Sequence, residues 1–251
     1  MIDKKMLTRT FSRIAGRYDA CASVQNRIAG RLAATITCSQ PRSILEIGCG
    51  TGNFTTVLLE RFPGARLVGV DISGDMIDIA RRKTAAFAAV FKVADAEALN
   101  FREHFDLIAS NAAFQWFSDL SGTMRRFKNL LNRRGALYFS TFGPQTFCEL
   151  RESLRLFDGR KHVVAEQFLD KTAVQKILRD RFAKSIIEER CLTVTFASLR
   201  ELFEHIKYTS GVTGGVKKIW TPQALRLLEK IYRKKFKRIA ATYQVFLCHA
   251  R

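Results

Sequence analysis

Short runs of apolar residues alternate with longer segments of helical spacing along the first 143 residues. The short runs predict buried strands, and the segments between them predict amphipathic helices. Short strands joined by helices of this length imply right-handed crossovers and a parallel sheet covered on both faces. The expected strands are Ser43–Leu45, Arg66–Asp71, Val90–Ala94, Phe105–Ser110 and Gly135–Phe142, and the expected helices are Ser23–Thr37, Asn53–Phe62, Asp75–Ala86 and Leu120–Leu131.

The alternation becomes irregular after residue 143. Two late β-rich runs predict strands, which together with the first five give a seven-stranded sheet whose last strand is reversed. Thr221 and Pro222 predict a helix start, since threonine caps a helix and proline suits its first position. The late strands are expected at Ser185–Thr195 and Ile239–Cys248, and the late helices at Cys148–Phe157, Lys171–Phe182, Leu199–Tyr208 and from Pro222 to about Arg238.

The length and composition indicate one domain. A chain of 251 residues is long enough for one large α/β domain with a full core, and 47% of its residues are hydrophobic. The sequence has no repeat, low-complexity tract or long linker. We expect a helical cover at residues 1–40, a cofactor-binding core at 41–143, and helical insertions over the cleft and basic surface at 144–182 and 199–238.

A glycine-rich segment, Glu46–Gly52, follows the first predicted strand. Its pattern is G-x-G-x-G preceded by an acid, whereas dinucleotide-binding folds typically carry G-x-G-x-x-G. Glycines at 48, 50 and 52 permit positive φ and a close approach of a ligand to the backbone. A carboxylate at Glu46 suits the ammonium of S-adenosylmethionine better than it suits NAD. The loop alone is a weak signal, because many strand–helix turns carry glycines for geometry.

Polar residues at the ends of the next strands strengthen the signal. Asp71, which ends the second strand 19 residues after Gly52, is placed to bind the ribose hydroxyls. Asp95 can accept from the adenine amine, and Asn111 lies at the mouth of the same cleft. Each one alone is compatible with an ordinary turn residue, but together they predict one site at the carboxyl ends of the strands. Ile72, Met76 and Ala96 are expected beside the cofactor as well.

The charge adds a possible partner. The chain has 42 Lys and Arg against 23 Asp and Glu, a formal net charge of +19, which attracts polyanions. Between Lys217 and Arg238 there are nine basic residues and one acid, Glu229. An apolar stripe leaves these basic residues facing outward, either as a solvated face or as a docking surface. The stripe consists of Leu225, Leu228, Ile231 and Tyr232.

Other features point to a cytoplasmic protein without a metal. No apolar run approaches the roughly 18 residues that span a bilayer, and the first 16 residues lack an apolar signal core. The six cysteines form no C-x-x-C pair, and the four histidines are scattered. We therefore expect reduced thiols, no metal site and no membrane association.

Beyond the glycine loop, several stretches resemble one family, the malonyl-acyl-carrier-protein O-methyltransferases of biotin synthesis (the BioC family). The resemblance covers nearly the whole chain. Arg133 and Arg134 replace its usual proline before Gly135, and Cys21 stands where histidine is more usual. The matching stretches are Phe11–Ala20, Gln25, Ser110–Trp116, Phe139–Pro144, Glu149–Arg151 and Ala241–Val245.

This resemblance implies a fold, a reaction and a partner. The fold is the Rossmann-like, seven-stranded α/β sheet of class I methyltransferases, with helices on both faces and a helical lid insertion. The reaction transfers a methyl group from S-adenosylmethionine to the free carboxylate of a malonyl thioester, which starts pimeloyl synthesis and leaves S-adenosylhomocysteine. An acidic acyl carrier protein, or coenzyme A, carries the thioester. The basic helix fits such a carrier.

The resemblance also suggests catalytic residues. Malonate is already ionised at neutral pH, so the site needs alignment and a dry pocket rather than a general base. Arg151 is the candidate cation for the carboxylate, because its planar fork can hold two oxygens. Gln115 is expected to donate to the malonyl group, Trp116 to wall the pocket, and Tyr18 to close over the cofactor. The expected cofactor-binding set is Tyr18, Glu46, Gly48, Gly50, Gly52, Asp71, Ile72, Met76, Asp95, Ala96 and Asn111.

Two other classes of function remain compatible with part of the pattern. A basic methyltransferase can act on RNA or DNA through phosphate contacts, or on another small carboxylate. Against nucleic acid, Ser110–Ala113 lacks the Asn/Asp-Pro-Pro-aromatic stretch typical of amino-methylating enzymes, and no RNA-binding module is visible. A non-catalytic protein that binds through its basic helix leaves the glycine loop unexplained.

Overall fold

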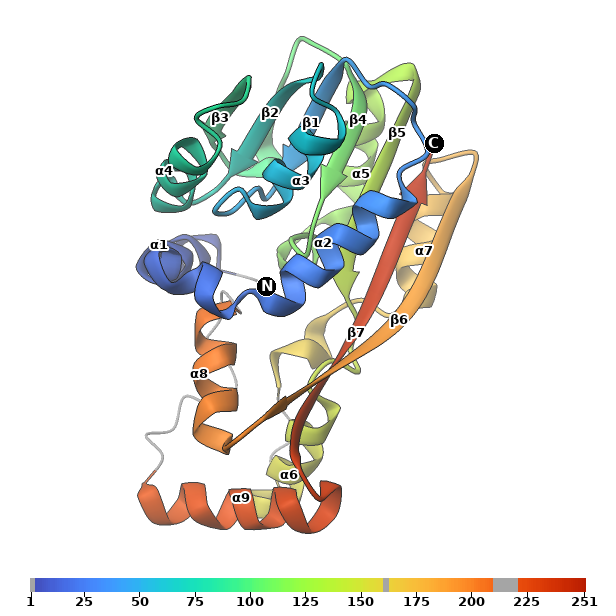
Figure 1. Ribbon diagram of the computed structural model, residues 1–251. Helices are drawn as coiled ribbons and strands as arrows, with labels where there is room; N and C mark the ends of the chain where they lie inside the picture. Colours follow the sequence, from blue (N-terminus) through green and yellow to red (C-terminus); the bar gives the residue numbers. More distant parts are fainter. Residues whose placement is uncertain (1–2, 160–162, 210–220) are drawn as a thin grey trace.

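A single seven-stranded sheet forms the centre of the computed structural model, which describes residues 3–159, 163–209 and 221–251 (Figure 1). The strand order is β3-β2-β1-β4-β5-β7-β6. The pairings of β1 to β5 are all parallel, while β7 runs antiparallel to both β5 and β6. The predicted sheet with its last strand reversed is confirmed. The strands are β1 Ser43–Ile47, β2 Arg66–Asp71, β3 Ala89–Val93, β4 Phe105–Ser110, β5 Leu131–Phe142, β6 Ser185–Phe196 and β7 Ile239–Ala250.

Helices cover both faces of the sheet, as predicted. Neighbouring residues of a strand point to opposite faces: Ile44 packs with residues of α2 and α3, whereas Leu45 packs with residues of α5 and α7. Within the described residues, no helix is long and apolar enough to cross a membrane. The helices are α1 Lys4–Cys21, α2 Ser23–Thr35, α3 Asn53–Arg61, α4 Gly74–Lys83, α5 Leu120–Leu130, α6 Cys148–Asp158, α7 Lys171–Arg179, α8 Leu199–Thr209 and α9 Pro222–Phe236.

The start of β5 and the placement of α7 differ from the sequence prediction. β5 begins at Leu131 rather than Gly135, because Asn132 to Arg134 continue the strand without an apolar pattern. α7 was expected within an insertion over the cleft, but it packs against α5 and β6 on the sheet. Residues 160–162 and 210–220, which include parts of the expected insertions and of the basic segment, lie outside the described residues.

The pair β6–β7 extends beyond the end of the parallel sheet. β6 pairs with β7 along its whole length, from Ser185 with Ala250 to Phe196 with Ile239. β5 pairs with only the second half of β7, because Phe142 at its end faces Val245. The free half of the pair therefore projects past the carboxyl ends of the parallel strands. There it carries α8 and α9, which lie with α6 below the sheet in Figure 1.

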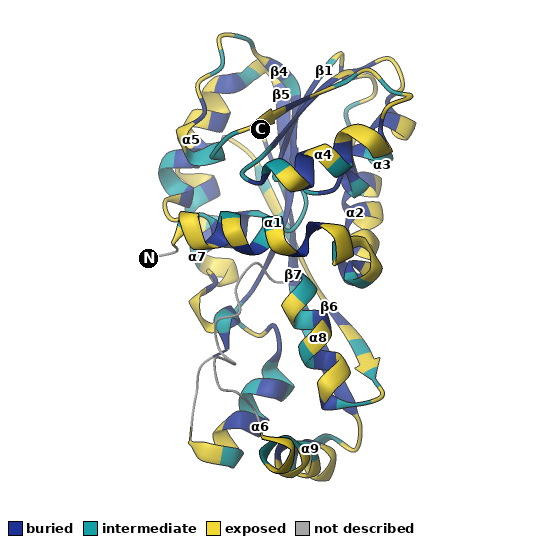
Figure 2. Ribbon diagram, turned by 90° about the vertical axis from the view of Figure 1, so that its left-hand side faces the viewer, coloured by how far each residue is buried: buried dark blue, intermediate teal, exposed yellow. Residues whose placement is uncertain are grey.

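α6 and α9 pack on each other at this projecting end (Figure 2). Leu228 of α9 is fully buried in a hydrophobic cluster that also contains Leu150 and Leu154 of α6. Glu149 of α6 binds β7, since its Oε2 accepts from the backbone N of Thr242 at 3.0 Å. Side-chain burial and this hydrogen bond together join α6, α9 and β7 into one unit.

We expect Leu228→Ala to lower the free energy of unfolding by about 2–5 kcal/mol, because it leaves a cavity between α9 and α6. The matched control is Leu227→Ala, the same change at the neighbouring residue, which is 53% exposed. That control should change stability by less than about 0.5 kcal/mol. Urea denaturation followed by circular dichroism measures both. Equal effects of the two substitutions would contradict the packing of α9 described above.

Candidate active site

The loop between β1 and α3 has the conformation that its glycines allow. Gly48, Gly50 and Gly52 have φ of +68°, +54° and +85°, a region that other residues rarely adopt. At Gly48 there is also no room, since a Cβ would lie 2.5 Å from the Cβ of Ala113. The backbone N of Gly48 donates to the carbonyl of Val70 at 2.7 Å. The loop is therefore fixed between β2 and the chain after β4, with its backbone accessible.

Asp71, at the end of β2, fastens this loop. Its Oδ2 accepts from the backbone N of Gly50 and its Oδ1 from the backbone N of Ser73, each at 2.9 Å. Burial raises the pKa of Asp71, while these hydrogen bonds oppose the shift because they favour the charged form. The backbone N of Ile72 is a third donor to this carboxylate, which with about four acceptor positions retains capacity for a further donor.

A cavity of about 670 Å³ opens beside Asp71, between the strand ends and α1. We call it the main cavity. It contains most of the residues that the sequence predicted for the cofactor, drawn from four strand ends and from the N-terminal helix. Of the predicted set, Glu46 and Gly52 do not line it. Those that line it are Tyr18, Gly48, Gly50, Asp71, Ile72, Met76, Asp95, Ala96 and Asn111.

The structure corrects the expectation for Glu46. Its side chain is 1% exposed and turns toward α3, where its Oε2 accepts from the Thr55 hydroxyl at 2.6 Å. Burial raises the pKa of Glu46 to about 8, more than this hydrogen bond lowers it. Glu46 is therefore largely neutral at pH 7 and ties the strand to the helix. It is not placed to hold an ammonium group.

Helix α1 covers the main cavity and is fastened by polar contacts that the sequence did not predict. Asp19 accepts from the Thr51 hydroxyl at 2.5 Å and pairs with Lys83 at 2.6 Å. The hydroxyls of Ser12 and Ser73 lie 2.9 Å apart. These partners are far apart in sequence, so spacing alone gives no sign of them. They hold the cover against the glycine loop and α4.

Helix α1 contributes Tyr18 and Lys4 to the lining of the main cavity. Burial, and then the charge of Asp71, raises the pKa of Tyr18, so its hydroxyl stays protonated and can donate. The Nζ of Lys4 lies 3.3 Å from the Oδ1 of Asp95 and also pairs with Glu97. Asp95, the carboxylate expected to bind adenine, thus has the cationic Lys4 of α1 beside it.

Two smaller cavities adjoin the main one. The loop cavity, of about 320 Å³, lies beside the glycine loop and shares Tyr18 and Asn111 with the main cavity. The aromatic cavity, of about 310 Å³, shares Trp116 with the main cavity and Gln25 with the loop cavity. Its described lining residues carry no formal charge. They are Gln25, Gln115, Trp116, Phe142, Thr146, Phe147, Val164, Phe168, Thr209 and Tyr243.

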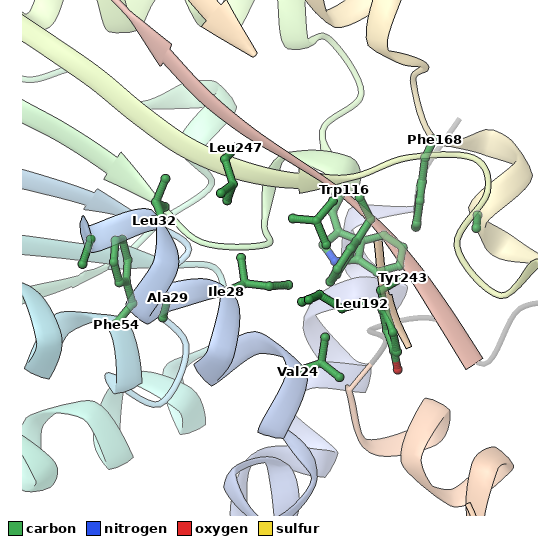
Figure 3. Packing of buried hydrophobic residues seen from close by; sticks show 14 of the residues in the cluster. Val24, Ile28, Ala29, Leu32, Phe54, Trp116, Phe168, Leu192, Tyr243 and Leu247 are labelled. Atoms are coloured by element: carbon green, nitrogen blue, oxygen red, sulfur yellow. The ribbon is translucent and has the colours of Figure 1, made fainter. Parts of the chain in front are cut away.

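Gln115 and Trp116 both line the aromatic cavity, and their expected contacts with a substrate stay a prediction. The Nε2 of Gln115 donates to the carbonyl of Ala112 at 2.6 Å, and its Oε1 accepts from the Thr141 hydroxyl at 3.3 Å. The ring of Trp116 meets Phe168 edge to face at 5.5 Å (Figure 3). The chain after β4 therefore presents a fixed amide and an aromatic wall to this cavity.

The lining of the aromatic cavity also includes Tyr243 of the projecting half of β7. Its hydroxyl lies 2.6 Å from the Nε2 of His205 on α8. Burial lowers the pKa of His205 to about 4, so the ring is neutral at pH 7. Tyr243 belongs to a stretch that carried the family resemblance, but its partner His205 was not predicted. The pair attaches α8 to the cavity wall.

The structure also corrects the expectation for Arg151, which lines none of these three cavities. Its guanidinium donates to the carbonyl of Pro144 at 3.1 Å and to the Oε1 of Gln145 at 2.8 Å. Side chains of a helix point toward its N-terminus, so Arg151, in the first turn of α6, reaches back to the turn after β5. It stabilises this turn, and the expected grip on a substrate carboxylate is not supported.

Comparisons with known proteins agree with this geometry. Residues 44–135 match the methyltransferase domain family. The chain is 30% identical to a malonyl-acyl-carrier-protein O-methyltransferase of Bacillus cytotoxicus over 99% of this chain and 92% of that protein. It is 32% identical to the protein of that name from Acetivibrio thermocellus, over 100% and 95% of the two chains. A third relative, malonyl-acyl-carrier-protein O-methyltransferase 1 of Ilyobacter polytropus, is 35% identical over 94% and 89%.

Solved structures share the fold at low identity. A putative methyltransferase from Bacillus halodurans superposes with a TM-score of 0.63 at 16% identity, over 89% of this chain and 97% of that one. Phosphoethanolamine N-methyltransferase 2 of Haemonchus contortus, in complex with S-adenosyl-L-methionine, gives 0.59 at 17% identity, over 94% and 56%. The predicted class I methyltransferase fold is confirmed.

We expect Glu46→Gln to stabilise the protein increasingly as pH rises from about 4.5 to 8. In this window the unfolded chain releases the Glu46 proton while the folded chain retains it, so wild-type stability falls with pH. Glutamine removes this loss, which is at most about 1.4 kcal/mol per pH unit. Urea denaturation at several pH values measures it, with Glu60→Gln on the exposed side of α3 as control. Parallel stability profiles for Glu46→Gln and wild type would contradict a buried, neutral Glu46.

Proposed function

This chain belongs to the malonyl-acyl-carrier-protein O-methyltransferase family, and we propose that it transfers a methyl group from S-adenosylmethionine to the free carboxylate of a malonyl thioester. One observation carries the proposal. Trp116 lines both the main cavity and the uncharged aromatic cavity. A methyl donor in the first cavity and an acceptor in the second would therefore both contact this residue. The product is the malonyl methyl ester, with S-adenosylhomocysteine left behind.

The residues present fit the cofactor. Positive φ at Gly48 and Gly50 brings bare backbone to the cavity wall, where a side chain would fill the space. Asp71 would hold the ribose hydroxyls, and Asp95 would accept from the adenine amine. The loop cavity leaves room for the amino-acid end. When bound, S-adenosylmethionine supplies an electrophilic methyl group on a sulfonium.

The aromatic cavity suits a carboxylate that must react. Malonate is ionised at neutral pH, so no side chain has to remove a proton. Gln115 presents a neutral amide to the cavity, and the second hydrogen of its Nε2 can orient the carboxylate without stabilising its charge as strongly as a cation would. Buried aromatic rings exclude water and strengthen these interactions. Neutral hydrogen-bond donors, and not the Arg151 guanidinium, would thus orient the substrate carboxylate.

Tyr18 and helix α1 complete the enclosure on the donor side. Tyr18 lines both the main cavity and the loop cavity, and Asp19 beside it is anchored to Thr51 and Lys83. A fixed cover holds the bound donor away from bulk water, which limits hydrolysis and keeps the reacting groups aligned.

A labelling experiment tests the proposed reaction. The enzyme is incubated with S-adenosylmethionine labelled in its methyl group and with malonyl-carrier protein, malonyl-coenzyme A or bulk RNA in separate reactions. We expect label in the malonyl thioesters as a methyl ester, which mild base releases as methanol. Succinyl-coenzyme A tests the preference for chain length. Label in RNA alone would overturn the proposal in favour of a nucleic-acid methyltransferase.

The carrier would dock on the outer face of α9. Arg226, Lys230 and Lys234 follow each other at helical spacing along a shallow groove, and none has an ion-pair partner among the residues described. Arg233 pairs with Glu229 at 2.8 Å, and Lys235 pairs with Glu152 at 3.0 Å. The first three cations are therefore available to an acidic carrier protein, whereas Arg233 and Lys235 serve the helix packing. A strongly anionic partner is favoured by charge complementarity.

The location of α9 supports this docking face. α9 packs on α6, and α6 begins at Cys148, directly after Phe147 of the aromatic cavity. A carrier bound at α9 therefore lies at the same end of the molecule as the acceptor site. A flexible arm that bears the thioester would have to bridge the remaining distance.

We expect the double substitution Lys230→Glu and Lys234→Glu to raise KM for malonyl-carrier protein about tenfold at low salt, with little change for malonyl-coenzyme A. The difference from wild type should shrink as ionic strength rises. The control is Arg125→Glu with Arg126→Glu on the exposed side of α5, which covers the sheet. If this control raises KM as much, the effect comes from overall charge and the α9 face is not the docking site.

A further inference from the structure

Gln25 occupies the boundary between two of the cavities. It lies on α2, its side chain is 6% exposed, and it lines both the loop cavity and the aromatic cavity. Its position is fixed, because its backbone carbonyl accepts from the Nδ2 of Asn111 at 3.0 Å. Asn111 in turn accepts from the Ser140 hydroxyl at 2.7 Å. The Gln25 amide is thus held between the places proposed for donor and acceptor.

The amide of Gln25 lacks partners in the described part of the protein. Its Oε1 is buried and receives no hydrogen bond, and no described residue accepts from its Nε2. Buried polar atoms almost always have partners, and leaving one unpaired costs stability. Gln115 differs, since its oxygen and its nitrogen each have a partner within the protein. The unpaired Gln25 amide therefore points to a ligand.

The two polar atoms of the Gln25 amide, Oε1 and Nε2, indicate which groups the ligand must provide. A carbonyl oxygen requires a donor, and an amino group requires an acceptor. On the loop side, Glu46 is turned away toward Thr55, and Asp19 is occupied by Thr51 and Lys83. A cationic amino group there would find the Oε1 of Gln25 as a free acceptor. On the aromatic side, the described lining residues carry no charge, so a carboxylate would need neutral donors such as Nε2.

We propose that the Gln25 amide joins the two substrates of the proposed function: Oε1 accepts from the ammonium of S-adenosylmethionine, and Nε2 donates to the carboxylate of the methyl acceptor. The inference rests on that function for the identity of both ligands. A single planar amide makes the two contacts interdependent, because fixing one end orients the other. Binding of the donor then favours binding of the acceptor in the reactive orientation.

The donor half is tested by calorimetry with Gln25→Met, a side chain of similar length without the amide. S-adenosylhomocysteine carries the ammonium, whereas 5′-methylthioadenosine lacks the whole amino-acid end. We expect the Kd of the first to rise about tenfold to 100-fold and that of the second to stay unchanged. Gln175→Met on α7, away from the cavities, is the matched control, and thermal melting verifies folding. Equal losses for both ligands, or no loss for either, would overturn the proposal.

The acceptor half is tested with Gln25→Glu. A carboxylate at this position still accepts from the ammonium but repels a second carboxylate, so Kd for S-adenosylhomocysteine should stay within about threefold or decrease. KM for the malonyl thioester should rise about tenfold or more. Inhibition by the uncharged methyl ester product should stay as in wild type. An unchanged KM would refute the acceptor contact.

Failure of the proposed function is distinguishable from failure of this inference. If the wild-type enzyme does not methylate a malonyl thioester, the proposed function is wrong, while the comparison of S-adenosylhomocysteine with 5′-methylthioadenosine still reports on the ammonium contact. If wild type is active and Gln25→Met binds both ligands normally, the function stands and the Gln25 inference is wrong.

Discussion

The close contact between Gly48 and Ala113 is the constraint on which the rest of the site depends. It lets the loop after β1 lie directly against the chain after β4, with 2.5 Å between a Cβ built at Gly48 and the Cβ of Ala113. Gln115 and Trp116 follow Ala113 by two and three residues, so any side chain at position 48 would displace the wall of the aromatic cavity too. The absence of one side chain thus sets the spacing between the proposed sites of donor and acceptor.

The two sides of the site come from different parts of the architecture. The carboxyl ends of the parallel strands supply the glycine loop, Asp71 and Asn111, beside the point where the sheet order reverses between β1 and β4, as in other open α/β sheets. The projecting half of β7 supplies Tyr243 for the aromatic cavity. The first side follows from the shared fold, whereas the second depends on the long β6–β7 pair. Differences in acceptor among proteins of this fold can therefore arise without any change at the glycine loop.

Regular periodicity made most of the fold predictable, and it also placed Asp71, Asp95 and Asn111 in one cavity. The exceptions share a cause, which is side-chain direction. Glu46 follows the strand alternation into the interior, where Thr55 binds it, and Arg151 follows the helix direction back to Pro144. Sequence order gives a residue's element but not its partner across the fold. The sequence indicates Gln25 only as part of the family pattern, because whether an amide is unpaired depends on neighbours from other parts of the fold.

The position of β7 within the sheet has a consequence for how the protein folds. β7 follows all other strands in sequence, yet it lies between β5 and β6 rather than at an edge. During synthesis the five parallel strands can assemble early, but β6 has no neighbour in the sheet until β7 has left the ribosome. Pairing over such a sequence separation is slow. Until this last strand inserts, β5 has no partner on that side of the sheet, and an unpaired strand edge is a template for aggregation.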